Sequence, residues 1–134
     1  MRVALVADTF SVEKGTGIAR YSQEMLSGLR SKGLFVEPIA PEPPAVPLGL
    51  AINHALRMPC LVRSKAGDFD VIHATSPITA LAFPLLSKPK VVTYWDLISL
   101  LCDNTSSASH TRFFAPLFLR IGKFADTILS LIHI

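Results

Sequence analysis

The sequence is poor in charge. Charged residues make up 17% of its 134 residues, and the formal net charge is only +3. Its basic residues are scattered, without a run of five or six and without interleaved aromatic residues, which excludes the usual pattern of a nucleic-acid-binding surface. We therefore expect no nucleic-acid partner.

Cysteines and long apolar runs are also scarce. Only Cys60 and Cys102 are present, without CxxC or metal-ligand spacing, and we expect two reduced, partly buried thiols. The four histidines show no metal-ligand spacing either, so we expect neither a metal nor a cofactor. No apolar run reaches the roughly 18 residues of a membrane span, and Asp8 interrupts the first apolar run too early for a signal peptide. These features predict a cytoplasmic protein.

Short apolar runs alternate with amphipathic stretches along the chain. The runs are typical of strands buried on both faces, and they lie at 3–7, 34–40, 69–73, 91–94 and from 127 onward. Between them we expect helices from Thr16 to Gly33, over 48–65 with an interruption at Pro59, over 77–86 and over 111–124. This alternation predicts parallel pairing in a Rossmann-like, doubly wound α/β sheet.

In such sheets ligands bind beyond the carboxyl ends of the strands, which selects the loops 8–16, 41–47, 74–76 and 95–110. In the first loop, Gly15 and Gly17 would let the backbone approach a ligand, and the free N–H groups of the helix start could bind a phosphate. An ordinary flexible loop before a helix is the alternative. A dinucleotide fingerprint with Glu37 is a third interpretation, but Arg20 occupies the third glycine position.

Two other strand ends carry polar or aromatic side chains. His73 closes the third strand, where it either donates a hydrogen bond or takes a proton, or is a structural histidine. After the fourth strand, Asp96 could orient a hydroxyl group and Trp95 could stack on a sugar. A packed Trp95 and an Asp96 that caps a turn are the alternatives.

The last six residues, 129–134, match the translated end sequence of a common transposase-based sequencing adapter. We therefore expect the gene to run only to Ile128 and the remainder to be adapter-derived. The alternative is that six natural apolar residues complete a strand.

Four segments, in order, resemble family-4 glycosyltransferases of the GT-B fold. GTGIARY is similar to the family's "GGIGRY", LRMP with DVIHAT to "LR-P … DVVHA", VVTYWDLI to "VVTIHDLIP", and FADTI to "ADRVIAVS". The resemblance covers nearly all of residues 1–128, and it identifies them as an incomplete N-terminal, acceptor-side domain, half of a GT-B architecture.

The resemblance implies a fragment of a retaining enzyme that moves a sugar from a nucleotide-sugar donor to a sugar or lipid-linked acceptor. The donor-holding domain would be missing, so the fragment alone would be inactive. A self-contained, non-catalytic nucleotide- or ligand-binding α/β module is the alternative function. The last expected helix carries Arg112, Arg120 and Lys123 near an aromatic face. A core-packed helix is the favoured interpretation, and peripheral membrane contact is the alternative, because such helices in the family can touch anionic membranes.

The strand-end loops and the resemblance together give the candidate site residues. The catalytic candidates are His73, Trp95 and Asp96. The candidates for donor or acceptor binding are Gly15, Thr16, Gly17, Ile18, Ser76 and Tyr94. Trp95 departs from the family, which usually has a histidine there, and an indole cannot relay a proton or accept a hydrogen bond through its ring nitrogen.

Overall fold

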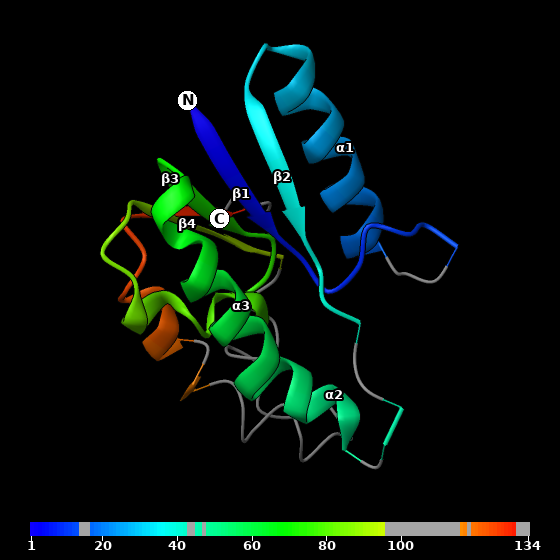
Figure 1. The fold of residues 1–134 in the computed structure, drawn as a ribbon, viewed down its shortest axis with the longest axis vertical. Helices are drawn as coiled ribbons and strands as arrows, with labels where there is room; N and C mark the ends of the chain where they lie inside the picture. The colour runs from blue at the N-terminus through cyan, green and yellow to red at the C-terminus, as the bar shows by residue number, and fades with distance from the viewer. Residues whose placement is uncertain (14–16, 43–44, 47, 96–115, 118, 131–134) are drawn as a thin grey trace.

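A computed structural model describes residues 1–13, 17–42, 45–46, 48–95, 116–117 and 119–130. They form a five-stranded, all-parallel sheet in the order β2-β1-β3-β4-β5, with helices packed on it (Figure 1). The strands are β1 (Arg2–Val6), β2 (Phe35–Ile39), β3 (Val71–Ala74), β4 (Lys90–Tyr94) and β5 (Thr127–Ser130). The predicted doubly wound α/β fold is therefore confirmed.

Helix α1 (Gly17–Ser31) covers one face of the sheet. Val3 and Leu5 of β1 point to this face and pack with Leu26 and Leu29 of the helix, because alternate residues of a strand face opposite sides. The helix ends before Gly33, whose φ of +79° is a left-handed conformation that glycine adopts without steric cost. The predicted stop signal at Gly33 is confirmed.

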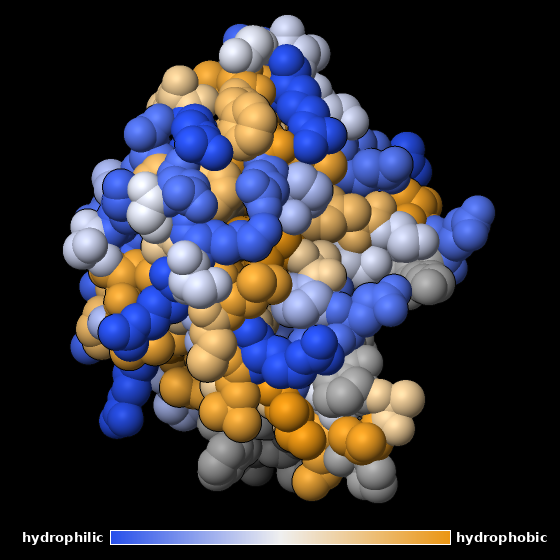
Figure 2. All heavy atoms as spheres, viewed as in Figure 1, coloured by the Kyte–Doolittle hydropathy of each residue, from blue (hydrophilic) through white to orange (hydrophobic). Residues whose placement is uncertain are grey.

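The other face carries the larger part of the core. Ala4 and Val6 of β1 point to this side, where they join Met58 and Val62 of helix α3 (Met58–Lys65). Helix α2 (Gly49–Ile52) precedes α3 in the chain, and apolar side chains gather over this region of the surface in Figure 2. They include exposed Leu48, Leu50, Ile52 and Leu56.

The helix predicted over 48–65 is interrupted before Pro59, as the proline suggests. Between α2 and α3 runs a π-helical turn, η1 (Asn53–Arg57), in which the Met58 N–H donates to the Asn53 carbonyl oxygen, five residues back. Pro59 then occupies the first turn of α3. Its missing N–H is tolerated there, because the N–H groups of a first helical turn have no partner within the helix.

Three local expectations are wrong. The helix expected over 77–86 is replaced by two 3₁₀ turns, Ile78–Ala80 and Phe83–Leu85, because Pro84 cannot donate an N–H to continue a helix. Cys60 is exposed instead of partly buried, since the residue after Pro59 lies on the outward side of α3. The last helix ends at 122, before the expected 124, and its expected start lies outside the described residues, as does Cys102.

Candidate functional site

The order of the strands places a topological switch point at β1 and β3, and we call the region beyond their carboxyl ends the crevice. From β1 the chain passes through α1 to β2 on one side, and then crosses to β3 on the other side of β1. Neighbouring connections that leave in opposite directions open a gap between the carboxyl ends of β1 and β3, which is where doubly wound sheets bind ligands. The Thr75 N–H donates to the Val6 carbonyl oxygen at 2.9 Å and extends the pairing past β3. Asp8 and Ser76, the next residues out, therefore flank the crevice.

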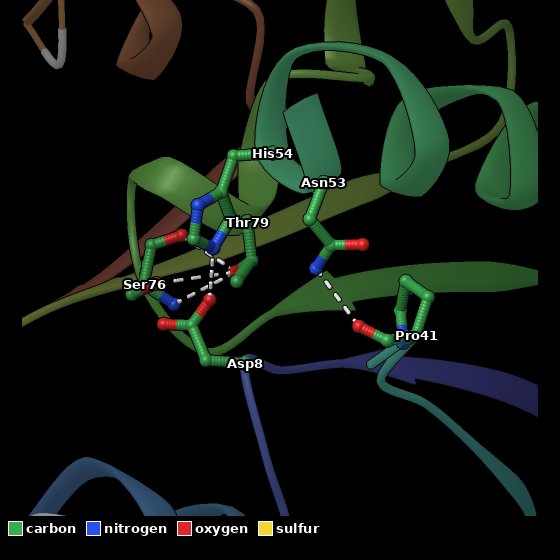
Figure 3. Close-up of polar contacts among 6 residues, drawn as sticks. All are labelled: Asp8, Pro41, Asn53, His54, Ser76 and Thr79. Carbon is green, nitrogen blue, oxygen red and sulfur yellow. Dashed lines mark hydrogen bonds and ion pairs between the residues drawn. The ribbon is translucent and has the colours of Figure 1, made fainter. Parts of the chain in front are cut away.

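Asp8 pairs with a histidine from a distant segment. The Asp8 Oδ1 atom contacts Nε2 of His54, which belongs to the π-helical turn (Figure 3). The His54 side chain is only 8% exposed, whereas that of Asp8 is 38% exposed. The carboxylate is thus partly exposed to solvent, and the buried imidazole contacts it from the protein interior.

The π-helical turn accounts for the position of His54. Asn53 and His54 are consecutive and both buried, whereas Ala55, Leu56 and Arg57 are exposed. The wider turn lets two successive side chains point inward, and π-turns within helices are frequent at functional sites. Asn53 donates its Nδ2–H to the Pro41 carbonyl oxygen at 2.8 Å and so anchors the turn to the chain that leaves β2.

A second polar group lies on the β3 side of the crevice. The Ser76 N–H donates to Thr79 Oγ1 at 3.2 Å, and the Thr79 hydroxyl donates to the Ser76 carbonyl oxygen at 2.8 Å. These two residues lie beside Asp8 and His54 in Figure 3. Within the described residues, two buried oxygens nearby have no hydrogen-bond partner, Asn53 Oδ1 and Thr75 Oγ1. Buried polar atoms are usually paired, so these two are exceptions to the general pattern.

Aromatic and hydroxyl groups connect α1 to the end of β4. The Tyr21 hydroxyl lies 3.1 Å from Thr93 Oγ1, and the rings of Tyr21 and Trp95 meet edge to face with centroids 4.6 Å apart. Trp95 donates its indole N–H to the Thr75 carbonyl oxygen at 2.7 Å. The same Thr93 hydroxyl meets Nε2 of His73 at 2.9 Å. The start of α1 and the ends of β3 and β4 therefore lie at one edge of the sheet.

His73 is buried beneath this group, with 5% of its surface exposed. Burial lowers the pKa of His73 from 6.5 to about 4, because the charged imidazolium loses its hydration. The ring is therefore neutral at pH 7 and is a hydrogen-bonding partner of Thr93. This geometry suits a residue that positions Thr93 from below.

The other residues expected at the site divide into three groups. Gly17 begins α1 and is exposed, and Ile18 is half-buried beside it. Tyr94 lies on the opposite face of the sheet from Thr93, in the core, where its hydroxyl meets the backbone of Gly122. Burial raises the Tyr94 pKa, and that hydrogen bond opposes the rise. Gly15, Thr16 and Asp96 lie outside the described residues.

Glu37 does not support a dinucleotide site. It stands in the middle of β2, opposite Ala4, and its carboxylate pairs with Lys65 of α3. The acidic residue of a dinucleotide fingerprint reaches a ribose at the carboxyl edge of the sheet, which Glu37 does not border.

Sequence reasoning missed Asp8 and His54. Asp8 was visible as the first residue of a loop at a strand end, but His54 lay within an expected helix and had no metal-ligand spacing. The two residues are 46 positions apart, so no local pattern joins them.

Protein-family models and curated proteins both give no match to this chain. In the described part of the chain, no helix is long and apolar enough to cross a membrane. No cluster of three or more metal-ligating side chains occurs within those same residues.

Proposed function

We propose that this chain is the acceptor-side half of a retaining glycosyltransferase, which moves a sugar from a nucleotide-sugar donor to a sugar or lipid-linked acceptor. One observation carries the proposal. The hydrogen bond between the Tyr21 and Thr93 hydroxyls, with the edge-to-face contact between Tyr21 and Trp95, brings the glycine-containing start of α1 to the end of β4. These are two of the four segments on which the resemblance to family 4 rests.

The chemistry of the crevice suits a sugar. Carbohydrates present hydroxyl groups at their edges and C–H groups on their faces, so they bind to a mixture of polar and aromatic side chains. Trp95 is half-buried, donates its indole N–H to Thr75 and meets the Tyr21 ring, so the exposed part of its ring is what a sugar face would contact. A carboxylate at Asp8 and a hydroxyl at Ser76 border the same edge.

A donor phosphate has a natural position at the start of α1. This helix is 15 residues long, and its first N–H groups together with its dipole favour a negative charge. An alanine-sized side chain at Gly17 would meet no described residue within 4 Å. In this proposal Trp95 contacts the sugar, and stabilisation of the leaving phosphate replaces the proton relay that an indole cannot perform.

Surface features near the last helix support peripheral membrane contact. Leu119 and Phe124 are exposed beside Arg120 and Lys123, which are also exposed. Apolar side chains flanked by basic ones favour the interface of an anionic membrane, where a lipid-linked acceptor would be held. Co-sedimentation with vesicles that contain anionic lipid should retain the chain, and vesicles of neutral lipid should not. Equal recovery with both would remove this part of the proposal.

The test of the proposed function is a comparison of ligands. We expect the chain to bind methyl hexopyranosides weakly, with about millimolar dissociation constants, and to change the emission of Trp95, its single tryptophan. Incubation with nucleotide sugars and acceptors should give no transfer. A chain that binds nucleoside diphosphates tightly and no glycoside would instead be the self-contained nucleotide-binding module. The variant W95F, which removes the tryptophan signal, is the control for the emission measurement.

A further inference from the structure

In the pair formed by Asp8 and His54, one side chain is buried and the other is partly exposed to solvent. A surface ion pair usually joins two exposed side chains and contributes little to stability. Here the imidazole is almost entirely buried, at 8% exposed, and it holds a carboxylate that remains 38% exposed. The pair therefore fixes the direction of a carboxylate that still reaches solvent.

Its location is equally specific. Asp8 follows β1 and lies next to Ser76, which follows β3, so the carboxylate stands at the boundary where the connections diverge. His54 reaches it from the π-helical turn, in which the successive residues Asn53 and His54 are both buried. The neighbouring Asn53 has a buried Oδ1 without a partner among the described residues, and this oxygen points away from Asp8 in Figure 3. A local helix distortion with an unpaired oxygen costs stability, and such costs are commonly retained where they place a functional group.

We propose that Asp8, oriented by His54, binds hydroxyl groups of the acceptor sugar. This inference rests on the proposed function, because it assigns the acceptor's subsite within it. An ionised carboxylate only accepts hydrogen bonds, and its two oxygens offer about four acceptor positions. His54 occupies one of them at Oδ1. The remaining positions receive neighbouring sugar hydroxyls.

Ser76 and Thr79 beside Asp8 are buried, at 5% and 2% exposed, and their hydroxyls meet each other and the Ser76 carbonyl oxygen. Asp8 therefore supplies the exposed polar atoms of the subsite. His54 acts as a positioning residue: it contacts Asp8, and the exposed carboxylate contacts the ligand.

Three variants test the assignment. D8N keeps the shape of the Asp8 side chain and removes its charge. H54Q keeps a polar group at position 54 but places that group differently from the imidazole nitrogen. E24Q is the matched control, because Glu24 is an exposed carboxylate that pairs with Arg20 on α1 at 3.0 Å. Dissociation constants for methyl hexopyranosides, measured by ligand-observed NMR, are compared with urea-unfolding curves of the same proteins.

We expect D8N to weaken glycoside binding about tenfold, since a charge-assisted hydrogen bond is lost. H54Q should weaken it by a smaller factor, about threefold, because Asp8 remains but is less well oriented. E24Q should bind as the original chain does, and D8N should keep its midpoint of unfolding within the range seen for E24Q.

Binding that survives D8N unchanged overturns the subsite and leaves the proposed function standing. A clear preference for methyl 2-amino-2-deoxyglucoside over neutral glycosides also overturns the assignment to neutral hydroxyl groups. If the original chain binds no methyl hexopyranoside, the proposed function fails and the subsite fails with it. Since D8N changes a half-buried side chain and keeps its shape, the test remains decisive even if H54Q does not fold.

Discussion

The phenolic oxygen of Tyr21 lies 3.1 Å from Thr93 Oγ1, and this contact ties the first helix to the fourth strand across 72 positions of sequence. The ring of Tyr21 also packs edge to face against Trp95, and the Thr93 hydroxyl also lies within hydrogen-bond distance of His73. The four side chains form a continuous group from the buried sheet to the crevice. Disturbing one member should therefore affect the arrangement of the others.

Replacing Tyr21 with phenylalanine isolates the hydrogen bond in this group. Y21F keeps the ring that meets Trp95 but removes the hydroxyl that meets Thr93. We expect the free energy of unfolding to fall by about 1 kcal/mol, the usual net value of one such bond. Urea unfolding measures the change. An unchanged midpoint would show that Thr93 finds its full complement of hydrogen bonds without Tyr21.

His73 should make the fold sensitive to acid. In the unfolded chain this side chain takes up a proton near pH 6.5, whereas in the fold burial lowers its pKa to about 4. Between these values the unfolded state binds more protons, so the free energy of unfolding decreases as pH falls from 6.5 to about 4 and then levels off. The loss is at most about 3 kcal/mol.

The variant H73Q provides the comparison for the acid effect, because glutamine does not titrate in this range. The difference in unfolding free energy between H73Q and the original chain should depend on pH within the same window. Parallel pH profiles for the two proteins would contradict the burial of a neutral His73.

Gly122 should not tolerate even a methyl group. A Cβ at this position would lie 2.6 Å from the Tyr94 hydroxyl oxygen, which is too close for contact. Tyr94 is 7% exposed, so its ring has little space to move aside. We expect G122A to lose about 1–3 kcal/mol, the usual cost of overpacking. Thermal unfolding by circular dichroism would show it, and a G122A protein as stable as the original would mean that Tyr94 moves freely.

Two glycines of the α1 region should respond in opposite directions to the same change. Gly28 lies within the helix, and a methyl group there would meet nothing within 4 Å, so G28A should stabilise the protein by up to about 1 kcal/mol. Gly33 has a φ of +79°, which strains any other residue, so G33A should destabilise it by about 1 kcal/mol. Urea unfolding of both variants gives the sign directly. A G33A variant more stable than G28A would contradict the left-handed turn after α1.

The sequence determined the elements with strong local signals. Continuous apolar runs located the strands, because a strand buried on both faces needs apolar side chains in both directions. Gly33 and Pro59 marked a helix end and a helix interruption, because their backbone restrictions act within a few residues. Where local signals competed, prediction failed: Pro84 and the Ser76–Thr79 hydrogen bonds broke the helix expected over 77–86 into 3₁₀ turns.

Only the tertiary structure decided which side chains share the crevice. Asp8 contacts His54, which lies 46 positions later in the sequence. His54 belongs to a π-helical turn that the spacing of apolar residues did not predict. Thr93 and Tyr94 are adjacent in sequence, yet one faces Tyr21 and the other the core around Gly122, because successive side chains of a strand point to opposite faces. The chain's local preferences set where elements begin and end. Strand order and helix packing, which depend on contacts far apart in sequence, determine what those elements bring together.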